Sequence, residues 1–354
     1  MKISIVITVL NEEKTIGGLL DSLLRQSKKA DEIIVVDGGS SDRTVQIIKH
    51  YQKKDRTIKL LLEKGNIAHG RNCGIEVAGN DIIATTDAGC VPHKDWLERV
   101  TEPFLTHLGG DPAAAGPPSE EYHHAATSWE SADTRQESPV DLVAGFYDMP
   151  AKTPMQKAIS IYLGIHPKRY DPETFLPSTR SMAFKKQLWE EVGGFDEKLD
   201  KTGEDTAFVY NIVKTGARIV QVGEARVDWK ELENITFKTA VKKFFDYAKG
   251  DAQSKIWRHP TKKLMSHNIK VILIFIRYLA CIILLVFSVS NPVLLVLLVI
   301  LAILYVLWPV WKWRDVIYDF RTKLWLPVIQ ISSDFAVMAG FISGIVAKAG
   351  PVRK

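Results

Sequence analysis

Acidic residues in three places of this chain have the types and positions that transfer chemistry needs. Asp37 ends the apolar run "EIIVV", Asp87 ends the run "DIIATT", and Glu204 and Asp205 stand together in "GEDTAF". An Asp at the end of a buried strand often serves a phosphate-bound metal, with a second carboxylate two residues later, where this chain has Gly89. A carboxylate can also take the proton of an attacking hydroxyl. The position of Asp87 therefore indicates a phosphate-bound metal, whereas Glu204 and Asp205, taken alone, are better explained as acids that favour the dipole at a helix N-terminus.

The elements that must position these residues can be read from the apolar pattern. "ISIVITVL", "EIIVV", "IKLLL" and "DIIATT" have the length of buried strands, and stretches with helical spacing separate them. This alternation predicts an α/β fold with a mixed, mainly parallel sheet and helices on both faces. Ligands of such sheets bind beyond the carboxyl ends of the strands. Residues 8–11, 37–41 and 87–90 all fall at those ends, so we expect them to share one edge.

Several function classes are excluded or disfavoured. The chain has 354 residues and a net charge of +5, which is too diffuse to indicate nucleic-acid binding but suits an anionic membrane surface. "TVLNEEKTIGG" after the first strand is not the glycine pattern of a dinucleotide site, and no Walker loop is present. The cysteines, Cys73, Cys90 and Cys281, are odd in number and lack metal-ligand spacing, so we expect reduced cytosolic thiols.

The last quarter of the sequence is strongly apolar. Segments 271–289 and 292–311 are predicted to be membrane helices, and 324–347 either crosses the bilayer or lies in its interface; a buried core helix is the alternative. Positive residues lie between the second and third segments, at Lys312, Arg314, Arg321 and Lys323. Because positive flanks favour the cytoplasmic side and no leader precedes the first strand, we expect a multi-pass protein of the cell membrane with a cytoplasmic catalytic domain.

Five segments resemble, in order and spacing, the family 2 glycosyltransferases of the GT-A fold. They are "ITVLNEEKTI", "EIIVVDGGSSDRT", "GRNCGIEVAGNDIIATTDAGCVP", "SMAFKKQLWEEVGGFDE" and "GEDTAF", within residues 3–225. The apolar end is similar to membrane-anchored members such as polyprenyl-phosphate glycosyltransferases. The resemblance implies inverting transfer of a sugar from a nucleoside-diphosphate sugar to a lipid-linked or membrane-proximal acceptor. Such reactions belong to the synthesis of cell-envelope polysaccharide or glycolipid.

The resemblance also implies roles for individual residues. Asp205 would be the catalytic base, with Glu204 beside it, and Arg180 and Ser181 are candidates for acceptor or phosphate contact; a structural arginine is the alternative. Arg71 would meet the nucleotide or its phosphates. The nucleotide-sugar site as a whole would comprise Thr8, Leu10, Asn11, Glu12, Asp37, Arg71, Asp87, Ala88 and Gly89.

Three positions depart from the pattern of the family. Thr8 replaces its proline, Gly38 replaces an aspartate that reads the nucleobase, and Gly89 replaces the second metal-binding aspartate. A divalent cation, Mg²⁺ or Mn²⁺, can still bind through Asp87, because Mg²⁺ keeps waters and uses substrate phosphates. His93 could be a substitute ligand or a plain loop histidine.

Three divisions of the chain are predicted: a GT-A domain over 1–235, an amphipathic juxtamembrane segment over 236–268, and a transmembrane region of two to three helices over 269–354. Helix 237–250 would lie on the membrane surface or pack on the protein. Residues 109–139 read as a long mobile loop.

Two alternatives to a glycosyltransferase stay open. A catalytically weak homologue could bind nucleotide-sugar or act as a membrane scaffold, a reading that the two glycines at 38 and 89 motivate. A nucleotidyltransferase would need a glycine-rich basic loop near the N-terminus, and this loop is missing. The Gln-x-x-Arg-Trp motif of processive synthases is also missing, which favours single transfer.

Overall fold

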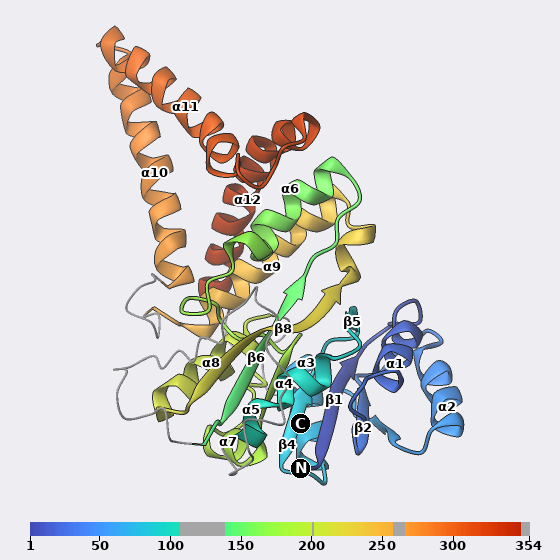
Figure 1. The fold of residues 1–354 in the computed structure, drawn as a ribbon. Helices are drawn as coiled ribbons and strands as arrows, with labels where there is room; N and C mark the ends of the chain where they lie inside the picture. The colour runs from blue at the N-terminus through green and yellow to red at the C-terminus, as the bar shows by residue number, and fades with distance from the viewer. Residues whose placement is uncertain (107–138, 200–201, 258–265, 348–354) are drawn as a thin grey trace. The chain divides into compact units, whose positions relative to one another are not determined.

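A computed structural model of the protein describes residues 1–106, 139–199, 202–257 and 266–347. The predicted loop at 109–139 lies outside these residues, apart from Pro139. The elements, labelled as in Figure 1, are β1 Ile3–Val9, α1 Ile16–Leu24, β2 Glu32–Asp37, α2 Thr44–Lys54, β3 Ile58–Leu62, α3 Ile67–Glu76, β4 Ile82–Thr85, β5 Cys90–Pro92, α4 Trp96–Thr101, α5 Pro103–Thr106, β6 Leu142–Asp148, α6 Pro154–Leu163, β7 Met182–Lys185, α7 Lys186–Glu191, α8 Glu204–Thr215, β8 Ile219–Trp229, α9 Phe237–Ser254, α10 His267–Ser288, α11 Pro292–Lys312 and α12 Phe320–Val346.

The described strands form one mixed sheet in the order β3-β2-β1-β4-β7-β6-β8-β5. Parallel pairing joins β1 to β2 and β4, β2 to β3, and β6 to β8. Antiparallel pairing places β7 between β4 and β6 and joins β5 to β8. The prediction of a mixed, mainly parallel sheet with covering helices is therefore confirmed, and the strands β1 to β4, which pair in parallel with one another, are the four apolar runs of the sequence.

Helices cover both faces of this sheet. On one face α3 lies close to β1 and β2, because a Cβ at Gly74 would meet Val6 Cγ1 at 2.6 Å. Side chains alternate along a strand, so Met182 and Phe184 of β7 enter this core while Ser181, just before the strand, points to the opposite face. There the buried Trp96 of α4 donates its indole N–H to the Ser181 hydroxyl. Buried packing on two sides thus fixes the strand ends that carry the polar residues.

The chain divides into two compact units, which differ from the predicted domains. The first contains residues 1–149 and 171–231, and the second contains 150–170 and most of the chain after 232. The predicted boundary at 235 lies close to the division at 231–232, and residues 150–170, which the prediction placed in the GT-A domain, fall in the second unit. The reason is that α6 packs on α12, where the Tyr162 hydroxyl donates to the Leu326 carbonyl at 3.2 Å. Local sequence does not reveal this long-range contact.

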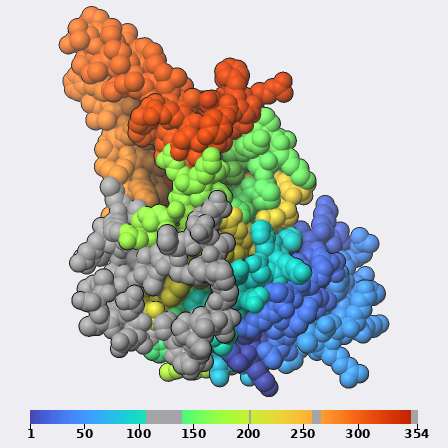
Figure 2. Space-filling model, in the orientation of Figure 1, coloured from blue at the N-terminus to red at the C-terminus, as the bar shows by residue number. Residues whose placement is uncertain are grey.

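Three helices of the second unit are long and apolar enough to cross a membrane. They are α10, α11 and α12, close to the predicted segments. The helices α10 and α11, orange in Figure 2, expose apolar side chains along most of their length. All three helices contribute to one polar cluster, in which Arg277 and the Tyr305 hydroxyl contact the buried Asp334 carboxylate. This polar cluster therefore connects α10, α11 and α12, the three candidate membrane-spanning helices.

Helix α9 packs along α12 through two glycines. A Cβ on Gly340 would lie 2.1 Å from the Phe245 carbonyl oxygen, and one on Gly344 would lie 2.5 Å from the Lys249 carbonyl oxygen. The spacing of four residues places both glycines on one face of α12, where small residues let two helix backbones approach. The sequence left two alternatives for helix 237–250, a position on the membrane surface or packing on the protein. The structure shows packing on the protein, against α12.

Candidate active site

The ends of β1 and β2 form the first part of the site. Val9 pairs with Asp37 in the parallel register, so the turns that follow both strands start side by side. Asn11 has a left-handed backbone (φ 57°). Its N–H donates to the Ser40 hydroxyl at 2.8 Å, and its side-chain oxygen accepts from the Ser41 N–H at 2.8 Å. These crossed hydrogen bonds hold the two turns together.

Asp37 is buried at the base of these turns. One carboxylate oxygen, Oδ2, accepts the N–H groups of Gly39 and Ser40 at 3.0 and 2.9 Å. The other, Oδ1, is buried and has no donor among the described residues. Leu10 is 54% exposed beside this turn, and a Cβ on Gly38 would lie 3.9 Å from its Cδ1. The arrangement offers an apolar surface next to a carboxylate.

Glu12 connects this part of the site with the acidic part. Its N–H donates to the Thr44 hydroxyl at 2.7 Å, and its carboxylate accepts from the Thr15 hydroxyl. Burial raises the pKa of Glu12 against the effect of Thr15, and the nearby negative charges of Glu231, Asp42 and Asp87 raise it further. Glu12 is therefore an internal support of the turn, within the electrostatic reach of Asp87.

Arg71, in the second turn of α3, organises the acidic residues. Its Nη1 lies 2.6 Å from Glu204 Oε1 and its Nη2 lies 2.8 Å from Asp87 Oδ1. The side chain is only 3% exposed. Burial opposes its charge, but Asp87, Glu204 and Asp205 outweigh that effect and raise the pKa of Arg71. Arg71 thus binds carboxylates of the protein, and its contact with the nucleotide or its phosphates, which the resemblance implied, stays a prediction.

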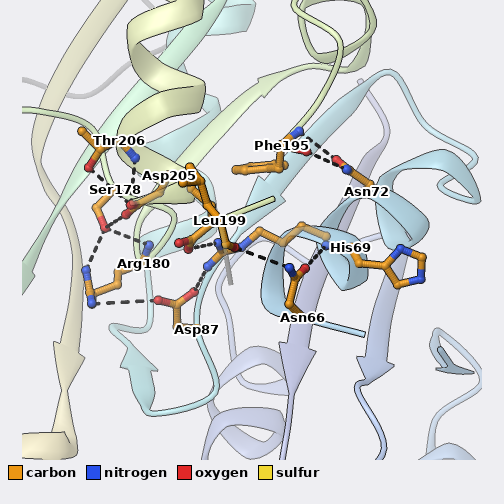
Figure 3. Close-up of polar contacts among 12 residues, drawn as sticks. Asn66, His69, Asn72, Asp87, Ser178, Arg180, Phe195, Leu199, Asp205 and Thr206 are labelled. Carbon is orange, nitrogen blue, oxygen red and sulfur yellow. Dashed lines mark hydrogen bonds and ion pairs between the residues drawn. The ribbon is translucent and has the colours of Figure 1, made fainter. Parts of the chain in front are cut away.

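Arg180 is the second guanidinium group at Asp87, and it is more accessible. Its Nε lies 3.9 Å from Asp87 Oδ2, and the group stacks over Trp229, 4.1 Å from the ring centre. Its Nη1 donates to the Ser178 hydroxyl, which in turn lies 3.3 Å from Asp205 Oδ2 (Figure 3). Stacking and hydrogen bonds fix the orientation of this cation, which suits recognition of phosphate.

Glu204 and Asp205 occupy different environments although they are neighbours at the start of α8. Glu204 is buried on Arg71, and burial together with Asp205 raises the pKa of Glu204 against the effect of Arg71. Asp205 is half-buried, and its carboxylate accepts the Thr206 N–H at 2.8 Å. Of the pair, Asp205 is the more accessible carboxylate, because Glu204 is buried with Oε1 on Arg71 and with Oε2 lacking a donor among the described residues.

The residues after β4 provide limited ligands for a divalent cation. Asp87 is the one carboxylate in this turn, and its two oxygens face Arg71 and Arg180. Ala88 is buried, and Gly89 provides only backbone, with its carbonyl accepting the Lys230 N–H. This set of donors fits a cation that is held largely by substrate phosphates and water. Asp87 would be its protein ligand.

Two residues that were considered for the site, Ser181 and His93, make other contacts in the structure. The Ser181 hydroxyl, 1% exposed, donates to the Ala225 carbonyl and accepts from Trp96, so it belongs to the core and does not face the site. The prediction of acceptor contact for Ser181 is therefore corrected. The ring of His93 lies 3.1 Å from Asp228 Oδ1, and Lys230 also contacts Asp228. His93 thus belongs to an ion-pair cluster separate from the Asp87 contacts.

Sequence reasoning missed several residues that complete the site. Ser178 links Arg180 to Asp205, and Trp229 and Tyr147 provide the aromatic surface for Arg180. Asn72 joins α3 to the segment before α8, since its side-chain oxygen accepts the Phe195 N–H at 2.9 Å (Figure 3). Asn72 follows Arg71 in "GRN", and Ser178 precedes Arg180 in "PSTR". Their position next to these two predicted site residues was the only sequence signal that could have identified them.

Comparison with known proteins finds a family model that matches part of the chain. Residues 4–140 match the sequence model of Glycosyl transferase family 2. Glycosyltransferase AglE of Haloferax volcanii is 36% identical over 102 residues, which are 27% of this chain and 33% of that protein. A dolichyl N-acetyl-alpha-D-glucosaminyl phosphate 3-beta-D-2,3-diacetamido-2,3-dideoxy-beta-D-glucuronosyltransferase of Methanococcus voltae is 34% identical over 119 residues, 32% of this chain and 37% of that protein. The chain thus spans about a third of the curated relatives it matches.

A solved structure gives the likeness over the whole chain. The mannosyltransferase PcManGT of Pyrobaculum calidifontis, determined with GDP-Man and Mn²⁺, aligns with a TM-score of 0.64 and 17% identity. The alignment covers 98% of this chain and 87% of that one. At this identity the likeness shows a shared fold.

Proposed function

Because this chain carries a family 2 glycosyltransferase domain, we propose that it transfers a sugar from a nucleoside-diphosphate sugar to an acceptor at a membrane. The observation that carries the proposal is the set of contacts that joins Arg71, Asp87, Arg180, Ser178 and Asp205. It combines an oriented cation with a partly accessible carboxylate. A displacement that releases a diphosphate needs both groups.

The nucleoside of the donor would bind at the paired turns after β1 and β2. The exposed Leu10 side chain offers a surface for a flat base, and the free lone pairs of Asp37 Oδ1 suit an N–H or O–H donor. Gly38 lacks the carboxylate that the resemblance associates with base recognition, so base selection would depend on Asp37 and the backbone of the turn. A guanine or a uracil nucleotide would fit this chemistry.

The reaction would be a single displacement with inversion. An acceptor oxygen attacks the anomeric carbon while the bond from that carbon to the diphosphate oxygen breaks. Asp205 accepts the proton of a hydroxyl acceptor, and Arg180 stabilises the negative charge that develops on the leaving diphosphate. A divalent cation at Asp87 would add charge neutralisation of the same diphosphate. Arg71 holds Asp87 and Glu204 in place throughout.

The acceptor would be lipid-linked or close to the membrane. Three helices of the second unit have the length and composition to cross a bilayer, and the name of the Methanococcus relative includes a dolichyl-linked sugar phosphate. The cationic residues between α11 and the second turn of α12 favour the cytoplasmic side for that end of both helices. The catalytic unit would then meet its donor in the cytoplasm.

A donor panel tests this proposal. The full chain in detergent is incubated with UDP-, GDP- and dTDP-sugars, and slow hydrolysis and binding of each donor are measured with Mn²⁺ and with EDTA. We expect one donor class to bind and hydrolyse, and Asp87→Ala to bind it at least about tenfold more weakly than the control Asp95→Ala. A protein that binds none of the sugar nucleotides would reject the proposal.

A second candidate function is nucleotide-sugar binding without transfer. The observation in its favour is Gly89, which leaves Asp87 as the one carboxylate at the expected cation position. In that case a donor would bind in the panel above, but wild type and Asp205→Asn would hydrolyse it at the same background rate.

A further inference from the structure

A second cluster of chemically active side chains lies on another side of α3. His69 and Cys73 are four residues apart, so they share one face of the helix. His69 lies about 200° around the helix axis from Arg71. Glu63 follows β3 and faces them. One ligand atom from each of these three residues lies within 4.8 Å of the others. We propose that Glu63, His69 and Cys73 bind a transition-metal ion, with Zn²⁺ as its natural occupant.

One nitrogen of the His69 imidazole is held by a carboxylate. His69 Nδ1 lies 3.1 Å from Glu197 Oε2, and Nε2 lies 3.5 Å from Cys73 Sγ. A carboxylate that accepts the Nδ1–H leaves Nε2 as the nitrogen that can bind an ion, which is the arrangement that carboxylates impose on zinc-binding histidines. Cys73 Sγ lies at similar distances from Nε2 and Nδ1, 3.5 and 3.9 Å, so the thiol would rotate to reach an ion on Nε2. Glu197 is itself held, because Asn72 Nδ2 donates to its Oε1 at 2.9 Å.

The backbone makes room for this histidine. A Cβ on Gly65 would lie 2.4 Å from His69 Cδ2, so only a glycine at 65 lets the ring occupy this position. The side chain of Asn66 accepts the His69 N–H at 2.9 Å and caps α3, which fixes the start of the helix relative to Glu63. Both features hold the three ligands near one another before any ion binds.

The donor set selects a particular class of ion. Thiolate, imidazole and carboxylate together suit Zn²⁺, whereas Mg²⁺ and Ca²⁺ prefer oxygen ligands. A cysteine thiol carries its proton near neutral pH in the absence of a bound cation. Binding then forms the metal–sulfur bond and releases that proton to solvent. Water would complete the coordination of three protein ligands.

A bound ion would stabilise the contact between α3 and the segment from Phe195 to Leu199, which lie next to the proposed catalytic residues in sequence. Asn66 Nδ2 donates to the Glu197 carbonyl at 2.7 Å. Asn72 Nδ2 donates to the Phe195 carbonyl at 2.9 Å, a contact that Figure 3 shows. The segment from Phe195 to Leu199 leads into α8, which begins with Glu204. An ion on His69 would strengthen this joint through Glu197. The spacing of the cysteines did not reveal the site because two of its ligands are not cysteines.

Co²⁺ is the probe that tests the proposal, because thiolate ligation of Co²⁺ produces a charge-transfer absorption band. The full chain in detergent, with any affinity tag removed and without nucleotide, is titrated with Co²⁺. We expect the band to saturate at one equivalent and to disappear when Zn²⁺ is added. Cys73→Ser should abolish the band, Glu63→Gln should weaken Co²⁺ binding at least about tenfold, and Glu197→Gln should weaken it about ten- to a hundredfold.

Two controls separate this site from others. Cys281→Ser removes a thiol from α10, and Asp87→Asn removes the carboxylate of the proposed donor site; both should keep the band. Near-ultraviolet circular dichroism checks that each variant is folded, and Glu63→Gln, which removes only a charge, provides a second route if Cys73→Ser is not. Wild type without a charge-transfer band at saturating Co²⁺, or a band unchanged in the folded Cys73 and Glu63 variants, would overturn the proposal.

Discussion

Arg71 Nη1 lies 2.6 Å from Glu204 Oε1, so α3 and the first residue of α8 are joined by a buried ion pair across 133 residues of sequence. The same guanidinium also binds Asp87 after β4. One cation thus fixes both the carboxylate of the proposed donor site and the helix that carries Asp205. The position of the proposed base and the stability of the fold therefore depend on the same side chain.

Replacement of this arginine should destabilise the protein strongly. Arg71→Leu leaves Glu204 and Asp87 without their shared cation, and removal of one partner of a buried ion pair costs about 3–5 kcal/mol. Thermal unfolding of the purified chain measures the loss. The control is Arg25→Leu, which breaks an exposed pair with Asp21 and should change stability by less than about 0.5 kcal/mol. An equal loss of stability in the two variants would show that the buried ion pairs of Arg71 contribute no more to stability than the exposed pair of Arg25.

Asp205→Asn should abolish transfer to a hydroxyl acceptor while donor affinity stays the same. The amide keeps the shape of the side chain but cannot accept a proton, and a lost general base reduces rate by at least about a hundredfold. Single-turnover kinetics and donor binding measure the two properties separately. Asp95→Asn, at a half-exposed carboxylate paired with Arg99, is the matched control. Full transfer by Asp205→Asn would exclude Asp205 as the base, or indicate a phosphate acceptor that has no proton to lose.

Gly89→Asp should increase the dependence on divalent cations. A Cβ at this position meets only the ring of Trp229, at 3.7 Å, so the new carboxylate fits beside Asp87. A second hard ligand should strengthen cation binding. We expect the ratio of donor affinity in Mn²⁺ to that in EDTA to rise about tenfold, as measured by calorimetry. Gly89→Asn controls for the size of the side chain, and an unchanged ratio in Gly89→Asp would contradict this assignment of the cation position.

The His93–Asp228 pair should make stability depend on pH. Its hydrogen bond to Asp228 raises the pKa of His93 above 6.5, and the same bond lowers the pKa of Asp228 from 3.8 to about 2. The contribution of His93 is therefore complete below 6.5 and is lost as pH rises through its raised pKa. The contribution of Asp228 is present above 3.8 and is lost as pH falls toward about 2.

His93→Gln tests this pair. The difference in Tm between wild type and the variant should be larger at about pH 5 than at about pH 9, with an effect under about 1 kcal/mol because both side chains are partly exposed. A difference that is constant across this range would mean that His93 carries no charge in the pair. His50→Gln is a control without an ion pair in the structure described here.

Gly340→Leu should disrupt the packing of α9 on α12. The first side-chain atom would already collide with the Phe245 carbonyl oxygen, which cannot move without its helix. Overpacking of this kind costs about 1–3 kcal/mol or more. Ala339→Leu adds the same bulk at an exposed neighbouring position and should be tolerated. Protease digestion and thermal unfolding in detergent compare the two, and equal stability would show that α9 does not depend on this contact.

The sequence predicted the parts of the fold that depend on local pattern. Asp37 and Asp87 were located because each ends a buried apolar run, and α10 to α12 were located because their apolar stretches have the length of a bilayer. The pairing of Arg71 with Glu204 could not be predicted in this way, since no periodicity relates residues that far apart. The bond between Ser181 and Trp96 was missed for the same reason. Which of Arg180 and Ser181 faces the site depends on which side of the sheet each occupies.

The position of Trp229 at the end of β8 limits how the catalytic unit can be shortened. The indole that supports Arg180 comes from the last residue of the last strand, 89 residues beyond the end of the 4–140 match, and Arg180 and Asp205 also lie beyond it. A lipid-free fragment for crystallography that stopped at the end of the matched segment would lose the proposed proton acceptor Asp205, the stacked Arg180 and the Trp229 ring behind it. A useful truncation has to retain β8 through Trp229 and to cut after it, before the α9 that belongs with α12.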